Sequence, residues 1–389
     1  MRARGLRPHL IANEHFRALI TKQGLDFIPM GTAAQYRQMV ENPDLWHPAK
    51  GFQVLVDHSI GPYVQPLYDI IAGFNPANTV VVSAGVLYGA RIAHEKLGMP
   101  WLTVHLQPAL FRTVYDTPPL GSAVFPPWLP RAAKRFLFRL LDKTVIDRAI
   151  GAKVNPVRQA LGLRPQTGFF ADSYHAPQKS LGLFPPWFAP PQPDWPPQVE
   201  LTGFIQFDGS DQTGLSPALQ TFLDEGEPPL AFTAGTAMQH GAEFFQVSVA
   251  AAQTLNRRAI LLTRHREQLP PTLPPGIIAI EYAPFSELLP RVALLVHHGG
   301  IGTVAQTLAA GIPQLVHPLA HDQPDNARRL QRLGVGATIL PSTYRPPKVV
   351  ATLNQLLTDA DVAQSCQKWA QKVDFAAALQ ATCDGIASV

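Results

Sequence analysis

The feature that most constrains the fold of this chain is a repeated alternation of short apolar runs with segments of helical spacing. Thr79–Ser83 is a β-branched apolar run that predicts a buried strand. Val86–Leu97 then carries apolar residues at helical spacing, and Gly98-Met99-Pro100 would end that helix. Trp101–Leu106 is the next apolar run. A strand, a helix and a second strand in this order predict an α/β fold with parallel sheets covered by helices.

The same alternation restarts in the second half of the chain. The sequence predicts strands at Leu230–Thr233, Arg258–Thr263, Val292–His297, Pro313–His317 and Val335–Leu340, and helices at Gly241–Leu255, from the glycine-rich turn to Ala310, at Asp325–Leu333, Pro347–Thr358 and Asp361–Val373. We therefore expect two doubly wound, Rossmann-like domains. In such domains ligands bind at the carboxyl ends of the strands and at domain interfaces.

A proline-rich segment separates the two halves. Seven of the 39 prolines lie between Pro185 and Pro197, and proline stiffens a chain into extended conformations. The segment could be a surface loop, but the pattern that restarts after it favours a linker. We expect a first domain over residues 1–184, a linker over 185–202, and a second domain over 203–389 that includes the C-terminal helices.

Composition excludes several classes of protein. The net charge of +4 is too small to indicate nucleic acid, and no apolar run reaches the roughly 18 residues that a membrane span needs. The first residues are basic but lack the apolar core of a signal peptide. Cys366 and Cys383, the two cysteines, form neither a disulfide framework nor a metal motif. A cytoplasmic location is the expectation from these features.

The strongest chemical signal follows the expected strand Val292–His297. His298, three glycines and Thr303 join this strand to a helix. Glycines let a ligand approach the backbone closely, and a helix N-terminus offers unpaired N–H groups and partial positive charge. The pattern favours a phosphate site over a plain tight turn. A second strand–helix turn, Thr233–Thr236, would supply further N–H groups or be an ordinary turn.

The next strand ends close to Asp322-Gln323, a carboxylate beside an amide. This pair suits the neighbouring hydroxyls of a sugar, although Asp322 could instead cap a helix. His317 and His321 have a spacing that metal ligands can use, but Pro318 between them opposes a shared helix, so we expect no metal. The chain contains no Walker A loop, dinucleotide fingerprint or serine-hydrolase elbow.

Residues 130–158 carry eight basic side chains and only two acidic ones, with apolar residues between them. A basic amphipathic helix can lie on an anionic membrane surface. The more ordinary interpretation is a helix with a solvated basic face and a core face. The basic residues are Arg131, Lys134, Arg135, Arg139, Lys143, Arg148, Lys153 and Arg158.

These motifs together resemble a known family. Tyr282–Gly336 joins YAP, HHGGIGT and HDQ in the order of the nucleotide-diphosphosugar signature of GT-B glycosyltransferases, the family of the plant, macrolide, glycopeptide and sterol enzymes. The resemblance covers nearly the whole chain. NPDLWHP, ARIAHEKLGMP, FPPWFAPPQPDWP and LTGFIQFDGS further resemble the rhamnosyltransferases of rhamnolipid biosynthesis, which use dTDP-rhamnose and a hydroxy-fatty-acid acceptor.

The resemblance implies an inverting, metal-independent transfer of rhamnose or glucose from a dTDP- or UDP-sugar to a hydroxyl of an apolar acceptor. The first domain would bind the acceptor. Composition, independently of the resemblance, indicates a cytoplasmic enzyme, and the basic pattern of residues 131–158 allows peripheral contact with a membrane. Tyr282 and Ala283 would contact the nucleobase. His298 and the two turns would contact the diphosphate, and Asp322 and Gln323 would bind the sugar. The implied donor site comprises Gly235, Thr236, Tyr282, Ala283, His298, Gly300, Gly302, Thr303, Asp322 and Gln323.

The chain also departs from the family. Members begin with a strand and a loop that carries or adjoins the catalytic base, whereas Met1 aligns inside the helix that follows, so no residue here inherits the base role. Gln306 stands where plant members carry a glutamate for the ribose. A non-catalytic sugar-nucleotide-binding subunit is therefore the alternative. A sugar-nucleotide epimerase is a weaker one, because HDQ and the acceptor-domain resemblance oppose it.

Overall fold

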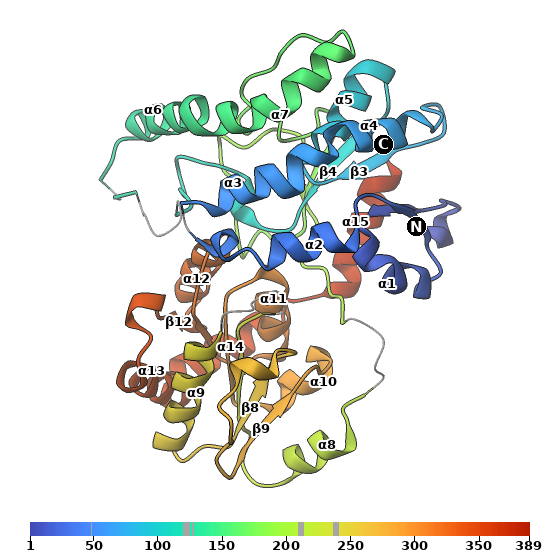
Figure 1. The fold of residues 1–389 in the computed structure, drawn as a ribbon. Coiled ribbons are helices and arrows are strands. Elements are labelled where there is room, and N and C mark those ends of the chain that lie inside the picture. Colours follow the sequence, from blue (N-terminus) through green and yellow to red (C-terminus); the bar gives the residue numbers. More distant parts are fainter. Residues whose placement is uncertain (48, 120–124, 127, 209–213, 236–240) are drawn as a thin grey trace. The chain divides into compact units, whose positions relative to one another are not determined.

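The fold is described from a computed structural model of residues 1–389, which describes all of them except 48, 120–124, 127, 209–213 and 236–240. The chain divides into two compact units (Figure 1). The first comprises Met1–Leu183, Pro190–Thr202 and Leu379–Val389, and the second comprises Phe184–Ala189 and Gly203–Ala378. Within the described residues, no helix combines the length and the apolar character needed to cross a bilayer.

All strand pairs of the first unit are parallel. One sheet holds β1 (His9–Ala12) and β2 (Asp26–Pro29), and another has the order β3 (Val81–Ser83), β4 (Trp101–His105), β5 (Ser180–Gly182), β6 (Val199–Leu201). The helices are α1 (Arg17–Lys22), α2 (Ala33–Val40), α3 (Gly51–Leu55), α4 (Val64–Ala72), α5 (Tyr88–Leu97), α6 (Arg131–Leu141) and α7 (Asp147–Ala160), and α15 (Phe375–Ala387) enters this unit at Leu379.

The βαβ unit expected in the first half is present as β3, α5 and β4. Ile92 of α5 and Trp101 of β4 are fully buried in the same apolar cluster. The Trp101 indole Nε1 donates to Ser83 Oγ at 2.9 Å, so this large ring is buried without an unpaired N–H. Gly98 ends α5 in the left-handed conformation, as its sequence position indicated.

The second unit contains one parallel sheet with the order β12-β11-β10-β7-β8-β9. Its strands are β7 (Leu230–Thr233), β8 (Ala259–Leu262), β9 (Ile277–Ile280), β10 (Leu294–His297), β11 (Gln314–Val316) and β12 (Gly336–Thr338). Its helices are α8 (Pro217–Asp224), α9 (Ala242–Thr254), α10 (Phe285–Leu288), α11 (Ile301–Ala310), α12 (Gln323–Arg332), α13 (Pro346–Thr358) and α14 (Ala360–Ala370). The expected α/β fold with parallel sheets is therefore confirmed.

Strand β10 lies at the centre of this sheet. It pairs with β7 on one side and with β11 on the other, and its residues are buried on both faces. Its last residue, His297, is in register with Thr233 at the end of β7 and with Val316 at the end of β11. Three strand ends therefore meet at one edge, which is where ligands bind in open parallel sheets.

The structure differs from the expected linker over 185–202. Residues 184–189 belong to the second unit, where Trp187 stacks on Trp369 with ring centroids 5.1 Å apart. Residues 190–202 belong to the first unit, where Asp194 accepts from the Thr113 hydroxyl at 2.6 Å and β6 pairs with β5. Prolines precede β6, which is an edge strand, and edge strands tolerate them.

The C-terminal boundary also differs, because Leu379–Val389 pack in the first unit.

Candidate donor-binding site

The site is built on the carboxyl ends of β7, β10 and β11. Its first element is His297, which is fully buried and whose role is structural. The Gly299 N–H donates to His297 Nδ1 at 3.1 Å, so Nε2 carries the proton and donates to Gln314 Oε1 at 2.9 Å. Burial lowers the pKa of His297 to about 3. The neutral ring therefore ties the start of the glycine turn to β11.

The ring of His298 lies between two glycines. A Cβ atom on Gly235 would lie 2.9 Å from the ring, and one on Gly300 would lie 2.5 Å from Nε2, so only glycine leaves the ring room at both positions. Burial lowers the pKa of His298 to about 4. Its Nδ1 is buried and has no hydrogen-bond partner among the described residues. A buried ring nitrogen without a protein partner leaves a hydrogen bond that a ligand or a water molecule can make.

Helix α11 begins directly after this turn, with Gly300 as its N-cap. The amides of Gly302 and Thr303 lie in the first turn, where no helical carbonyl is available to them. A Cβ atom on Gly302 would meet nothing within 4 Å, so the space beside its Cα atom is open. Free donors, the positive end of a helix and an empty approach are together the elements of an anion site.

The structure gives different surroundings to the two residues expected to hold the sugar. The Asp322 carboxylate accepts from the Ile301 N–H at the start of α11 and from Asn326 Nδ2 at 2.7 Å. Burial raises the pKa of Asp322 to about 6. Gln323 is only 3% exposed, and its Oε1 accepts from the backbone N–H groups of Leu319 and Ala320 at 2.7 and 3.1 Å. Its carbonyl oxygen therefore holds the loop.

Tyr282 and Ala283, which are expected to contact the nucleobase, follow strand β9. In the sheet, β9 and the strand that precedes the sugar residues, β11, lie on opposite sides of β7. The Tyr282 hydroxyl donates to the Asp208 carbonyl oxygen, and the Arg264 guanidinium lies 6.0 Å from the centre of the Tyr282 ring. Ala283 is buried in the apolar cluster below. In the second turn, Gly235 has a φ of 98°, which requires glycine. Thr236 lies outside the described residues.

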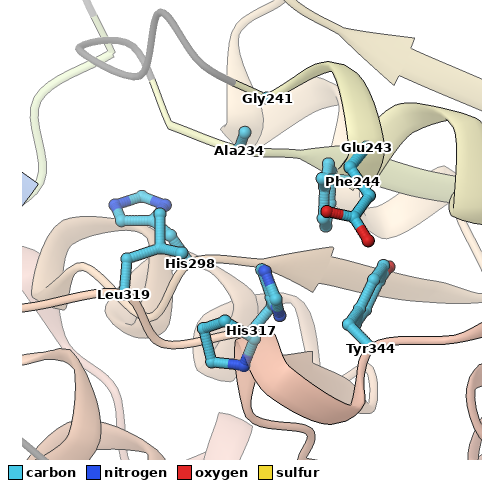
Figure 2. Close-up of a pocket in the computed structure, with 9 residues that line it drawn as sticks. Ala234, Gly241, Glu243, Phe244, His298, His317, Leu319 and Tyr344 are labelled. Atoms are coloured by element: carbon cyan, nitrogen blue, oxygen red, sulfur yellow. The ribbon is translucent and has the colours of Figure 1, made fainter. Parts of the chain in front are cut away.

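A cavity of about 170 Å³ opens beside His298 (Figure 2). Ala234, Phe244 and Leu319 supply apolar lining, and Glu243 supplies a carboxylate. The ring of His317 also lines the cavity and contacts the rings of Phe244 and Tyr344. The volume exceeds that of several waters. Sequence reasoning weighed His317 only as a metal ligand and did not find these ring contacts, because they join residues 73 and 27 positions apart in the chain. The described residues contain no group of three or more side chains placed to hold a metal.

Two histidines of the first unit, one buried and one half-buried, are in contact. His105, at the end of β4, lies with Nε2 3.1 Å from His175 Nδ1. Burial lowers the pKa of both rings, that of His175 to about 4. This pair lies outside the resemblance that identifies the donor residues, and the catalytic base stays unassigned.

Comparison with known proteins identifies the enzyme class. Residues 248–379 match the family model of the erythromycin biosynthesis protein CIII-like C-terminal domain. The O-mycaminosyltylonolide 6-deoxyallosyltransferase of Streptomyces fradiae is 28% identical over 404 residues, which cover 98% of this chain and 90% of that enzyme. The chain is a glycosyltransferase.

The structural neighbours of this glycosyltransferase show that its fold is GT-B. The glycosyltransferase of kitacinnamycin matches 98% of the chain and 92% of its own length, with a TM-score of 0.75 and 20% identity. A spinosyn rhamnosyltransferase solved with thymidine diphosphate matches 98% of the chain and 93% of its own length, with a TM-score of 0.65 and 19% identity. The expected macrolide, glycopeptide and sterol relatives are confirmed. The closer resemblance to rhamnolipid enzymes stays a prediction.

Proposed function

We propose that this glycosyltransferase moves a hexose from a nucleoside diphosphosugar, with inversion and without a metal ion. The observation that carries the proposal is the turn after β10. There the His298 ring, whose buried Nδ1 has no partner among the described residues, contacts Gly300 at the N-cap of α11. The amides of Gly302 and Thr303 lie in the first turn of this helix, and a Cβ atom on Gly302 would meet nothing within 4 Å. The amides are hydrogen-bond donors, and the His298 nitrogen is a donor in one of the two neutral tautomers of the ring. A set of donors suits a diphosphate.

In the reaction, the acceptor hydroxyl oxygen attacks the anomeric carbon as the bond to the diphosphate oxygen breaks. Positive charge develops on the sugar ring, and negative charge develops on the leaving diphosphate. Fixed donors aimed at such a charge stabilise the transition state more than the ground state. His298, which is neutral because of its lowered pKa, would donate one N–H to this charge, and the α11 amides would donate the others. The acceptor proton passes to a base outside the assigned residues.

We propose thymidine diphosphate as the carrier and a 6-deoxyhexose such as rhamnose as the sugar, with UDP-glucose as the alternative donor. Two observations on relatives support this choice: one is named for transferring a 6-deoxyallosyl group, and a structural neighbour is solved with thymidine diphosphate.

We propose that the acceptor is an apolar alcohol, such as a hydroxy fatty acid, bound by the first unit. The end of β4 supports this assignment, because Leu106 and Tyr115 after it are exposed apolar side chains. Parallel strands place ligands at this kind of edge. An acceptor of this class resides in or at a membrane, so the enzyme would work in peripheral contact with one.

The test is calorimetry of the whole chain with thymidine diphosphate and with uridine diphosphate, beside the His298→Ala variant. We expect micromolar to millimolar binding of at least one nucleotide, with and without a metal chelator, and weaker binding by the variant. A sugar-nucleotide that binds without any transfer to a panel of lipid and polyketide alcohols would favour the non-catalytic subunit. Absence of binding for both nucleotides would refute the proposed donor site.

A further inference from the structure

Helix α6 presents large apolar side chains to solvent. Phe136 is 65% exposed, Leu140 is 46% exposed and Leu137 is 38% exposed. Residues 136 and 140 are one helical turn apart, and 137 flanks them, so the three side chains form one strip along the helix. Trp128, which precedes the helix by three residues, is also largely exposed. A gathered apolar strip of this kind marks an interaction surface.

The charges around this strip have a single sign. Arg135, Arg139 and Lys143 are exposed on the same side of the helix as the strip, and Arg131 begins the helix over the ring of Tyr115. The two acidic residues of the segment are turned inward. Asp142 is buried in an ion pair with Arg112 at 2.6 Å, and Asp147 accepts from the backbone N–H groups of Gly168 and Phe169. The outer face of residues 131–145 is therefore basic and apolar.

The opposite face of the helix is fixed to the unit, so the exposed strip has a defined orientation. Phe138 is buried, and the Arg112 guanidinium lies 4.7 Å from the centre of its ring. The helix continues through a π-helical turn, Asp142–Ile146, into α7, as Figure 1 shows. Ile150 and Val154 of α7 belong to the main apolar cluster of the first unit. The strip is thus a rigid feature of the surface.

We propose that this outer face of α6, formed by Phe136, Leu137, Leu140, Arg135, Arg139 and Lys143, binds an anionic lipid membrane in the plane of its headgroups. Apolar side chains between basic ones suit a layer whose surface is negative and whose next few ångströms are hydrocarbon. A nucleic acid would use the basic residues but not the apolar strip. A protein partner would give no reason for the absence of exposed acidic groups from the face. The proposal does not depend on which donor the second unit binds.

The test is sedimentation of the whole chain with vesicles at about 0.1 M salt, where the screening length is about 10 Å. One vesicle preparation contains phosphatidylcholine alone, and the other contains equal amounts of phosphatidylcholine and phosphatidylglycerol. We expect binding to the second and little to the first. Each basic residue near an anionic surface contributes about fivefold to the partition coefficient, so Arg135→Gln with Arg139→Gln should lower it roughly 25-fold.

Two matched controls separate this surface from general effects. Arg37→Gln with Arg164→Gln removes the same charge from exposed positions elsewhere on the first unit, and should change the partition coefficient much less. Phe136→Ser with Leu140→Ser should abolish binding, whereas Leu340→Ser with Leu379→Ser, also exposed, should retain it. Unchanged thermal unfolding verifies that the variants fold, as their exposure predicts.

Three outcomes would overturn the proposal. The first is equal binding by the α6 variants and their controls. The second is absence of binding to anionic vesicles at this salt concentration. The third is binding to single-stranded DNA that depends on Arg135 and Arg139 but not on Phe136 and Leu140, which would assign the face to nucleic acid.

Discussion

Replacing Gly302 by alanine should change the affinity for the nucleotide without lowering the free energy of unfolding. The added Cβ would meet no atom within 4 Å, so the substitution causes no steric conflict in the free protein. The residue lies in the first turn of α11 and has no positive φ. Glycine in a helix costs up to about 1 kcal/mol relative to alanine. Gly302→Ala should therefore unfold with an unchanged free energy or one about 0.5 kcal/mol higher.

The same methyl group should be harmful once a diphosphate is bound. The methyl group would fill the open space beside Gly302, where the diphosphate is proposed to lie, and would push the phosphate oxygens away from the α11 amides. Loss of a hydrogen bond to a charged group costs about 1.5–3 kcal/mol. We expect the affinity for thymidine diphosphate to fall by roughly 10- to 150-fold, measured by calorimetry on the folded variant.

Two further glycines make the comparison decisive. Gly73→Ala, at the end of α4 with a negative φ, adds a methyl group in ordinary contact and should leave nucleotide binding unchanged. Gly300→Ala would place its Cβ 2.5 Å from His298 Nε2 and should disturb that ring. If Gly302→Ala is as stable as the wild type and binds the nucleotide within twofold of it, the phosphate does not lie at this helix end, and the site as argued is wrong.

The remaining predictions concern His298, Gln323 and Asp322. His298→Ala should lower kcat by 10²–10³ with any active donor and acceptor pair, because it removes a donor aimed at the leaving group; a loss below about threefold would make the ring structural. Gln323→Ala should lower the free energy of unfolding by about 2 kcal/mol, since two backbone N–H groups lose their acceptor, and chemical denaturation should show that Gln323→Glu retains most of it. The pKa of Asp322 is raised in the folded state to about 6. The protonated carboxyl group therefore contributes to the free energy of unfolding fully below the unfolded pKa of about 3.9, and this contribution is lost as the pH rises to about 6. In urea titrations, the free energy of unfolding of the wild type should fall by on the order of 2 kcal/mol relative to that of Asp322→Asn as the pH rises through this window. A difference between the two proteins that does not vary with pH would refute the buried-carboxyl argument.

The sequence predicts the elements whose apolar pattern can be recognised within a few consecutive residues. Strands β7, β8 and β10 are runs of buried apolar residues long enough to recognise, and α11 begins after a glycine turn that marks it. Strands β5 and β6 have three residues each, which is too short for a period to appear. The second of them also follows two prolines. The sequence therefore predicts a linker in the proline-rich segment, although its last residues form strand β6 at the edge of a sheet.

The C-terminal segment could not be placed for a different reason. Its residues are helical by pattern, but they pack on the first unit through contacts that span almost the whole chain. Arg4 pairs with Asp384 at 2.7 Å, and Lys179 Nζ donates to Ser388 Oγ at 2.8 Å. Gly385 lies close to Leu181 of β5, where a Cβ would be 3.1 Å from the leucine side chain. Such pairings depend on tertiary structure, about which a helical period carries no information.

The donor site illustrates how adjacent residues of one motif can have separate functions. Chemistry alone suggested that Asp322 and Gln323 act together on sugar hydroxyls. In the structure, the Asn326 amide donates both to the Gly299 carbonyl at 2.9 Å and to the Asp322 carboxylate, and that carboxylate also accepts from the Ile301 N–H. These contacts attach the start of α12 to both ends of the glycine turn, while Gln323 holds the preceding loop. The position of the α11 amides is therefore set by α12, so substitutions at Asn326 should affect diphosphate binding without touching the ligand.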